Sequence, residues 1–168
     1  MSGNNQQKTI LVTGCSSGIG AWCARALKAE GWHVIASART DEDISDLRND
    51  GIEAHYLDYA DPASIEAFFA SAMHSTGGRC DALFNNGGYG QVGAVEDLPV
   101  DALRAQFDAN FFGWHDLTRR VIPVMRAQGH GRIVQCSSIL GLVPMRFRGA
   151  YNASKHALEG LSVTLAME

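Results

Sequence analysis

Tyr151 and Lys155 lie four positions apart, in the run Tyr-Asn-Ala-Ser-Lys, immediately before an apolar stretch with helical spacing. On a helix, residues i and i+4 lie on one face about one turn apart, so the phenol and the ammonium can meet over one site. A free phenol has a pKa of about 10 and is a poor base at neutral pH. An ammonium about 4 Å away stabilises a phenolate by about 4 kcal/mol at an effective dielectric constant of about 20. The pair is therefore a candidate proton-transfer device, although a packed tyrosine and a solvated lysine would show the same spacing.

A glycine-rich turn lies near the start of the chain and reads Thr13-Gly14-Cys15-Ser16-Ser17-Gly18-Ile19-Gly20. It follows a short apolar run and opens an amphipathic one. Glycines in such a turn permit close backbone approach, and the N-terminus of the following helix offers unpaired N–H groups to a pyrophosphate. A plain strand-to-helix connection is the alternative. In this context the turn indicates a dinucleotide phosphate site.

The elements that must position these residues can be read from the alternation of short apolar runs with amphipathic segments. We expect strands at 8–13, 32–38, 52–57, 82–84 and 132–136, and helices at 19–30, 41–49, 62–74, 100–128 and from 151 onward. This alternation predicts an α/β fold, a doubly wound parallel sheet of the Rossmann-like type with helices on both faces. Such sheets bind ligands at the carboxyl ends of their strands. The glycine-rich turn and the Tyr-x-x-x-Lys pair both follow such ends.

Composition narrows the class of protein. The chain has 168 residues, of which 46% are hydrophobic, so we expect one globular domain over 1–168. The net charge of -4 provides no basic stripe for nucleic acid and no polybasic patch for a membrane. The first eight residues are polar, the four cysteines are scattered, and the six histidines show no paired metal spacing. We therefore expect a cytoplasmic protein with reduced thiols and no metal.

The catalytic motifs resemble the short-chain dehydrogenase/reductase family, in its single-domain branch. The resemblance rests on the Gly-x-x-x-Gly-x-Gly turn and on the Tyr-x-x-x-Lys pair, whose tyrosine lies 13 residues after Ser138. It implies an oxidoreductase that transfers a hydride between a nicotinamide cofactor and a carbonyl or secondary alcohol. Tyr151 would be the acid/base, Lys155 would support it and hold the nicotinamide ribose, and Ser138, in preference to Ser137, would hold the substrate oxygen. Asn110 would complete the tetrad by supporting a water; an exposed surface position is the alternative.

The resemblance also assigns cofactor contacts. In addition to Tyr151 and Lys155, it implies contacts at Gly14, Ser16, Ser17, Gly18, Ile19, Gly20, Asp58 and Asn86. Family members that use NAD commonly carry an acidic residue at the end of the second strand, where this chain has Arg39. Because a guanidinium grips phosphate in bidentate fashion, we expect NADP(H) in preference to NAD(H). In the alternative, Arg39 is solvated and Asp41 or Glu42 binds the ribose of NAD.

The sequence says less about the substrate and the quaternary structure than about the cofactor. An apolar carbonyl compound would suit walls built from Tyr89, Leu140, Leu142, Val143 and Phe147, unless these residues only pack the loop. The resemblance implies a homo-oligomer. It also implies about 80–100 further residues, a size consistent with a typical doubly wound domain. The last strands would then be missing from this chain.

Two other functions stay open. Nucleotide-sugar epimerases and dehydratases share the Tyr-x-x-x-Lys pair, although they commonly show Gly-x-x-Gly-x-x-Gly. A non-catalytic dinucleotide-binding module is the second alternative. Cofactor binding without hydride transfer would distinguish that module from an enzyme.

Overall fold

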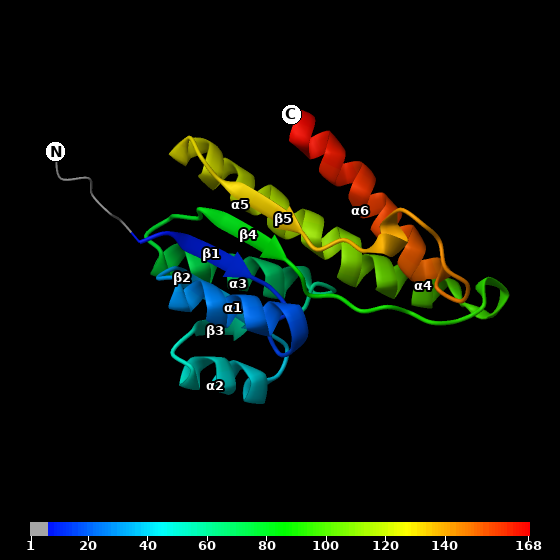
Figure 1. Ribbon diagram of the computed structural model, residues 1–168, viewed down its shortest axis with the longest axis horizontal. Coiled ribbons are helices and arrows are strands. Elements are labelled where there is room, and N and C mark those ends of the chain that lie inside the picture. Colours follow the sequence, from blue (N-terminus) through cyan, green and yellow to red (C-terminus); the bar gives the residue numbers. More distant parts are fainter. Residues whose placement is uncertain (1–6) are drawn as a thin grey trace.

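A five-stranded parallel sheet forms the centre of the computed structural model, which describes residues 7–168 (Figure 1). The strand order is β3-β2-β1-β4-β5. The strands span Thr9–Val12 (β1), His33–Ala38 (β2), Glu53–Tyr56 (β3), Ala82–Asn85 (β4) and Arg132–Gln135 (β5). The chain runs outward from β1 to β3 and then returns to place β4 on the other side of β1. This reversal makes the carboxyl ends of β1 and β4 the switch point, where a doubly wound sheet opens a crevice.

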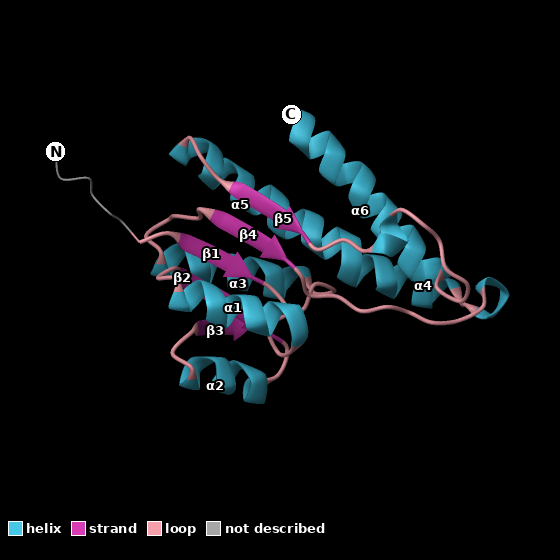
Figure 2. Cartoon of the chain, in the orientation of Figure 1, coloured by secondary structure: helices cyan, strands magenta, loops and turns pink. Residues whose placement is uncertain are grey.

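Helices cover both faces of the sheet (Figure 2). They span Gly18–Ala29 (α1), Asp41–Asn49 (α2), Pro62–Ser75 (α3), Val100–Phe107 (α4), Gly113–Gln128 (α5) and Gly149–Met167 (α6). A five-residue π-helical segment, Asp108–Phe112 (η2), joins α4 to α5, and short 3-10 turns occur at Val95–Asp97 (η1) and Ile139–Gly141 (η3). Helices α1 and α2 pack on one face, and α3 and α5 on the other, while α6 lies beside α4. The predicted doubly wound fold is confirmed.

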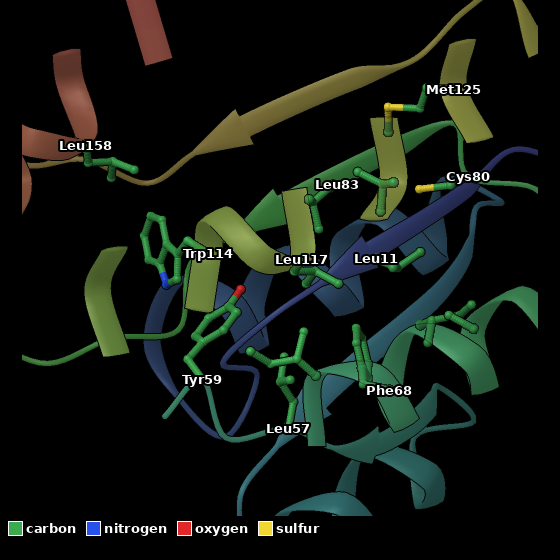
Figure 3. Close-up of a cluster of buried hydrophobic side chains, with 14 residues drawn as sticks. Leu11, Leu57, Tyr59, Phe68, Cys80, Leu83, Trp114, Leu117, Met125 and Leu158 are labelled. Atoms are coloured by element: carbon green, nitrogen blue, oxygen red, sulfur yellow. The ribbon is translucent and has the colours of Figure 1, made fainter. Parts of the chain in front are cut away.

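Side chains of β1 alternate between two buried clusters. Leu11 faces a cluster that includes Phe68 of α3 and Leu117 of α5, whereas Ile10 and Val12 face a second cluster that includes residues of α1 and α2. Successive strand residues point to opposite faces, so the sheet separates two cores. Figure 3 shows the first cluster, with Tyr59 and Trp114 at the end nearer α6.

Local sequence explains where the helices begin and end. The Thr40 hydroxyl accepts a hydrogen bond from the Asp43 N–H and caps α2, while the Asp61 carboxylate caps α3 ahead of Pro62. Gly129, with φ +75°, ends α5 in the left-handed conformation that glycine favours. The expected ranges agree with the structure to within one residue for the strands and two for the helices. The π-helical segment and the two 3-10 turns were not predicted.

Two results concern the expectations, made from the sequence, about a membrane span and a metal site. No helix among residues 7–168 is long and apolar enough to cross a membrane. Nor does this described part of the chain hold three or more His, Cys, Asp or Glu side chains grouped so that they could bind a metal ion. The expectation about the polar N-terminus depends on residues 1–6, which lie outside the described residues.

Candidate active site

Two neighbouring clefts open at the carboxyl ends of the strands. The glycine-turn cleft encloses about 340 Å³ and includes Gly14, Ser16, Ser17 and Ile19 in its lining. The Tyr151 cleft encloses about 400 Å³ and is lined by residues that include Asn110, Tyr151 and Lys155. Asn86, Gly88 and Tyr89 line both clefts. A ligand in one cleft would therefore lie next to a ligand in the other.

The glycine-rich turn is shaped by backbone contacts that only glycine allows. Gly14 has φ +66°, and a Cβ placed there would clash with Gly87 Cα; a Cβ on Gly20 would clash with the Gly14 carbonyl. The turn is fixed to β2 because the Gly14 N–H donates to Ser37 Oγ at 3.3 Å. Ser17 occupies the N-cap position of α1 in an extended conformation, and its side chain makes no capping hydrogen bond. Among residues 7–168, the first-turn N–H groups of α1 therefore have no acceptor and are available to an anion. Gly18 and Gly20 do not line the cleft.

Thr13 ties this turn to the end of β4, and sequence reasoning missed it. Its Oγ1 accepts hydrogen bonds from the Asn86 N–H at 2.9 Å and the Gly87 N–H at 3.2 Å, and it lies 2.9 Å from the Tyr59 hydroxyl oxygen. Thr13 is fully buried. A β-branched polar residue at the end of an apolar strand is the signal that could have indicated a structural hub.

The two asparagines after β4 have different roles. Asn85 is fully buried, accepts from the Tyr59 hydroxyl and donates to Thr118 Oγ1 at 3.0 Å. The Asn86 side chain donates to the Thr13 carbonyl at 3.0 Å and lines both clefts. Asn85 is therefore part of the buried hydrogen-bond network, whereas Asn86, for which a cofactor contact was predicted, faces the two clefts.

The far end of the glycine-turn cleft is built by the segments that follow β2 and β3. Arg39 and Asp58 both line it, as does Asp43. The alternative ribose ligands Asp41 and Glu42 do not line it. Among residues 7–168, no hydrogen bond or ion pair engages the Arg39 side chain. Its guanidinium is available to a ligand in this cleft.

Asn110 lies in the π-helical segment and is fully buried, so the surface alternative was wrong. Its Oδ1 accepts from the Tyr89 N–H at 3.1 Å, and its Nδ2 donates to the Tyr89 carbonyl at 2.8 Å. Gln106, also fully buried, donates to the same carbonyl at 2.8 Å and accepts from the Gln91 N–H at 2.6 Å. The side-chain amides of Asn110 and Gln106 thus fix the backbone at Tyr89, a residue that lines both clefts. Sequence reasoning did not single out Gln106.

Lys155 is the buried cation of the site, with 4% of its surface exposed. Its Nζ donates to the Cys136 carbonyl at 2.7 Å. The same atom lies 4.2 Å from the centroid of the Trp114 ring and 5.7 Å from that of the Tyr151 ring. Burial lowers the pKa of Lys155 to about 8, because removal from water disfavours the charged form. Contacts with two aromatic faces compensate part of that cost.

Tyr151 lies in the first turn of α6, half-buried, one helical turn before Lys155. Two serines precede it on the segment after β5. Ser137 lines the Tyr151 cleft, and its Oγ is buried with no hydrogen-bond partner among residues 7–168. Ser138 does not line the cleft; its Oγ accepts from the Leu140 N–H at 3.1 Å and caps η3. The structure thus gathers Asn110, Tyr151 and Lys155 around one cleft and places Ser138 beside it.

The apolar residues proposed as substrate walls divide into two groups. Tyr89 and Leu140 line the Tyr151 cleft, together with Met145. Leu142, Val143 and Phe147 do not line it and are 66%, 57% and 62% exposed. The cleft therefore has fewer apolar walls than the sequence suggested.

Known proteins are similar to this chain in sequence and in structure. A family model for short chain dehydrogenases matches residues 8–168. The chain belongs to the short-chain dehydrogenase/reductase family. It is 40% identical over 168 residues to the uncharacterized oxidoreductase YbbO of Escherichia coli, and the match covers 100% of this chain and 62% of YbbO. The name of that relative describes it as an oxidoreductase.

Solved structures agree with this assignment. The crystal structure of a short-chain dehydrogenase from Streptomyces avermitilis superposes with a TM-score of 0.91 at 41% identity, over 96% of this chain and 60% of that one. A variant of actinorhodin polyketide ketoreductase, determined with NADPH, superposes with a TM-score of 0.88 at 32% identity, over 96% of this chain and 64% of that one. This family member therefore spans about three-fifths of the length of these relatives.

Proposed function

We propose that the protein transfers a hydride between NADP(H) and a carbonyl or secondary alcohol, with Tyr151 as the acid/base. The observation that carries this proposal is the position of Lys155. Lys155 is buried, its ammonium lies 5.7 Å from the centroid of the Tyr151 ring, and the residue lines the cleft next to the glycine turn. A buried cation beside a phenol stabilises the phenolate and makes proton transfer feasible near neutral pH.

The glycine-turn cleft fits a dinucleotide. Any side chain at Gly14 or Gly20 would fill the turn, and the Ser17 side chain makes no hydrogen bond that would cap the N-terminus of α1. Gly14, Ser16, Ser17 and Ile19 would hold the pyrophosphate, with Gly18 and Gly20 shaping the turn. Asp58 and Asn86, at the edges of this cleft, would contact the adenine and nicotinamide halves. When bound, the cofactor supplies or accepts the hydride.

The preference for NADP(H) is supported by Arg39. It lines the cleft without a carboxylate partner among residues 7–168, whereas Asp41 and Glu42 lie outside the lining. A free guanidinium at this place suits a 2′-phosphate. The ketoreductase with NADPH is a relative that was determined with the phosphorylated cofactor. NAD(H) is the alternative, and the affinities of an Arg39→Ala variant for the two cofactors distinguish them.

Each side chain of the Tyr151 cleft would then have its own role in the reaction. Tyr151 would give a proton to the carbonyl oxygen in reduction and remove it in oxidation, while Lys155 holds the positive charge beside it. Ser138 would orient the substrate oxygen after its hydroxyl leaves the Leu140 N–H. The side-chain amide of Asn110 binds Tyr89 through its oxygen and one of its two N–H groups. Its contribution would therefore be to fix the wall beside the reacting atoms, and its second N–H would support a water there.

The deciding experiment is an assay of the full-length protein with NADPH and NADP against a panel of ketones and alcohols. Hydride transfer is expected with NADPH, and the tyrosine-to-phenylalanine variant serves as the inactive control. Tight binding of NADPH without reduction of any carbonyl would favour a non-catalytic module. Turnover of a nucleotide sugar without net consumption of cofactor would favour an epimerase or dehydratase. Homo-oligomerisation, a small-molecule substrate and a cytoplasmic location belong to the same proposal.

A further inference from the structure

The Tyr151 cleft carries positive charge in a protein with a net charge of -4. Among residues 7–168, Lys155 and Arg148 are its two charged lining residues, and no Asp or Glu lines it. Lys155 is buried and bonded to the Cys136 carbonyl. The partly exposed charge in this cleft therefore belongs to Arg148.

The backbone of Arg148 is held firmly at the start of α6. Its carbonyl accepts from the Asn152 N–H at 2.8 Å, and the residue forms a bridge with Gly93. The neighbouring Gly93 N–H donates to the Phe147 carbonyl at 3.0 Å. These bonds fix the point from which the side chain extends, which reduces the entropy lost when it binds a ligand.

The guanidinium itself is weakly engaged. Its one hydrogen bond among the described residues runs from Nη1 to the Gly90 carbonyl at 3.4 Å, near the limit for a hydrogen bond. It has no carboxylate partner in the part of the chain that the structure describes. By contrast, five other arginines pair with aspartates, namely Arg25, Arg79, Arg104, Arg119 and Arg120. Most of the five N–H donors of Arg148 are therefore free for a ligand.

Arg148 and the acid/base flank the same glycine. A Cβ built on Gly90 would lie 3.3 Å from Arg148 Nη1 and 3.5 Å from Tyr151 Cδ2. The guanidinium and the phenol ring are thus close neighbours on one wall of the cleft. A substrate whose carbonyl reaches Tyr151 would bring the atoms a few bonds away toward Arg148.

We propose that Arg148 determines substrate specificity by binding an anionic group, a carboxylate or a phosphate, on the carbonyl substrate. The inference rests on the proposed hydride transfer and narrows its substrate class from apolar ketones to anionic ones. A planar guanidinium binds either oxyanion through two parallel hydrogen bonds. Leu140 and Met145, on the lining of the same cleft, would contact the apolar part of such a substrate.

The test compares matched substrates with NADPH on the full-length protein. One pair is a keto acid and its methyl ester, and the second is a keto phosphate and its unphosphorylated hydroxyketone. Wild type should prefer the charged member of at least one pair, and the pair that shows the preference identifies the anion. Arg148→Gln should lower kcat/KM for the charged member by about 10- to 100-fold, and leave the neutral member within about threefold. Arg148→Lys should restore part of the preference, which a purely structural role would not predict.

Arg146→Gln is the matched control, since Arg146 lies two residues away, is exposed and lines neither cleft. Equal rates for charged and neutral members in wild type would overturn the proposal, as would an equal loss on both members in Arg148→Gln. If wild type reduced no member of either pair, the hydride-transfer function would fail instead. In that case titration of the keto acid and of the keto phosphate into the protein–NADP complex decides the role of Arg148. Weaker binding of either ligand to Arg148→Gln supports the role, and equal dissociation constants for both ligands refute it.

Discussion

The buried ammonium of Lys155 should make the stability of the protein depend on pH in a way that a single substitution removes. Burial lowers the pKa of Lys155 to about 8, whereas a lysine in the unfolded chain titrates near 10.5. Between these values the unfolded state binds more protons than the folded state, so stability rises with pH. Below about pH 8 the cost of burying the charge is fully present, and it is lost as pH rises toward about 10.5.

The size of the effect follows from the two values. A difference of about 2.5 pKa units corresponds to about 3 kcal/mol at 1.36 kcal/mol per unit. About 2 kcal/mol of this is recovered between about pH 7 and pH 9.5. Lys155→Met cannot titrate, so wild type should gain about 2 kcal/mol relative to this variant over that interval.

The assay is urea-induced unfolding of wild type and Lys155→Met at pH 7 and pH 9.5, in the absence of cofactor. The same substitution at Lys28, which is exposed, provides the matched control for general effects of pH on unfolding. A difference between wild type and Lys155→Met that stays constant over the interval would refute the burial of a charged lysine beside Trp114 and Tyr151.

Two further predictions concern the cofactor cleft and the fold. Arg39→Ala should weaken NADPH binding by about 10- to 100-fold and leave NADH binding unchanged, because a charge-assisted hydrogen bond to phosphate is lost. Fluorescence titration with both cofactors measures the two affinities. Equal losses of affinity for NADPH and NADH would refute the contact. Burial opposes ionisation of Asp81, but hydrogen bonds from the Thr9 N–H, from His130, from the Thr9 hydroxyl and from Arg79 outweigh it and lower the pKa of Asp81 to about 2. A depressed carboxylate pKa stabilises the fold above about pH 4, and that stability is lost as pH falls toward 2. Asp81→Asn should therefore reduce the free energy of unfolding by about 2 kcal/mol at pH 7. The control is Asp46→Asn, at an exposed residue. A reduction of the unfolding free energy that persists undiminished near pH 2 would contradict this prediction.

The fold was predictable because its signals are local. Short apolar runs that alternate with amphipathic segments determine strands and helices, and Gly14 and Gly20 mark the turn that opens the cofactor cleft. The position of Tyr151 and Lys155 one turn apart follows from helical geometry alone. These features need no knowledge of which elements pack together.

The surroundings of the site were not predictable, because they are made by contacts between distant segments. Spacing places Lys155 near Tyr151, but it does not reveal the Trp114 ring or the Cys136 carbonyl that hold the ammonium from the other side. The π-helical segment that buries Asn110 has no sequence signature comparable to a cap or a glycine turn. Thr13 looked like the last residue of a strand, yet its hydroxyl joins two strand ends.

Tyr151→Phe tests the central claim most directly, because it removes one hydroxyl and keeps the ring that packs near Lys155. Stopped-flow or steady-state reduction of a carbonyl substrate is compared with NADPH binding for the same variant. We predict that turnover falls by at least about 10³-fold while the dissociation constant for NADPH stays within about threefold of wild type. Turnover within about tenfold of wild type, with cofactor binding intact, would contradict the account.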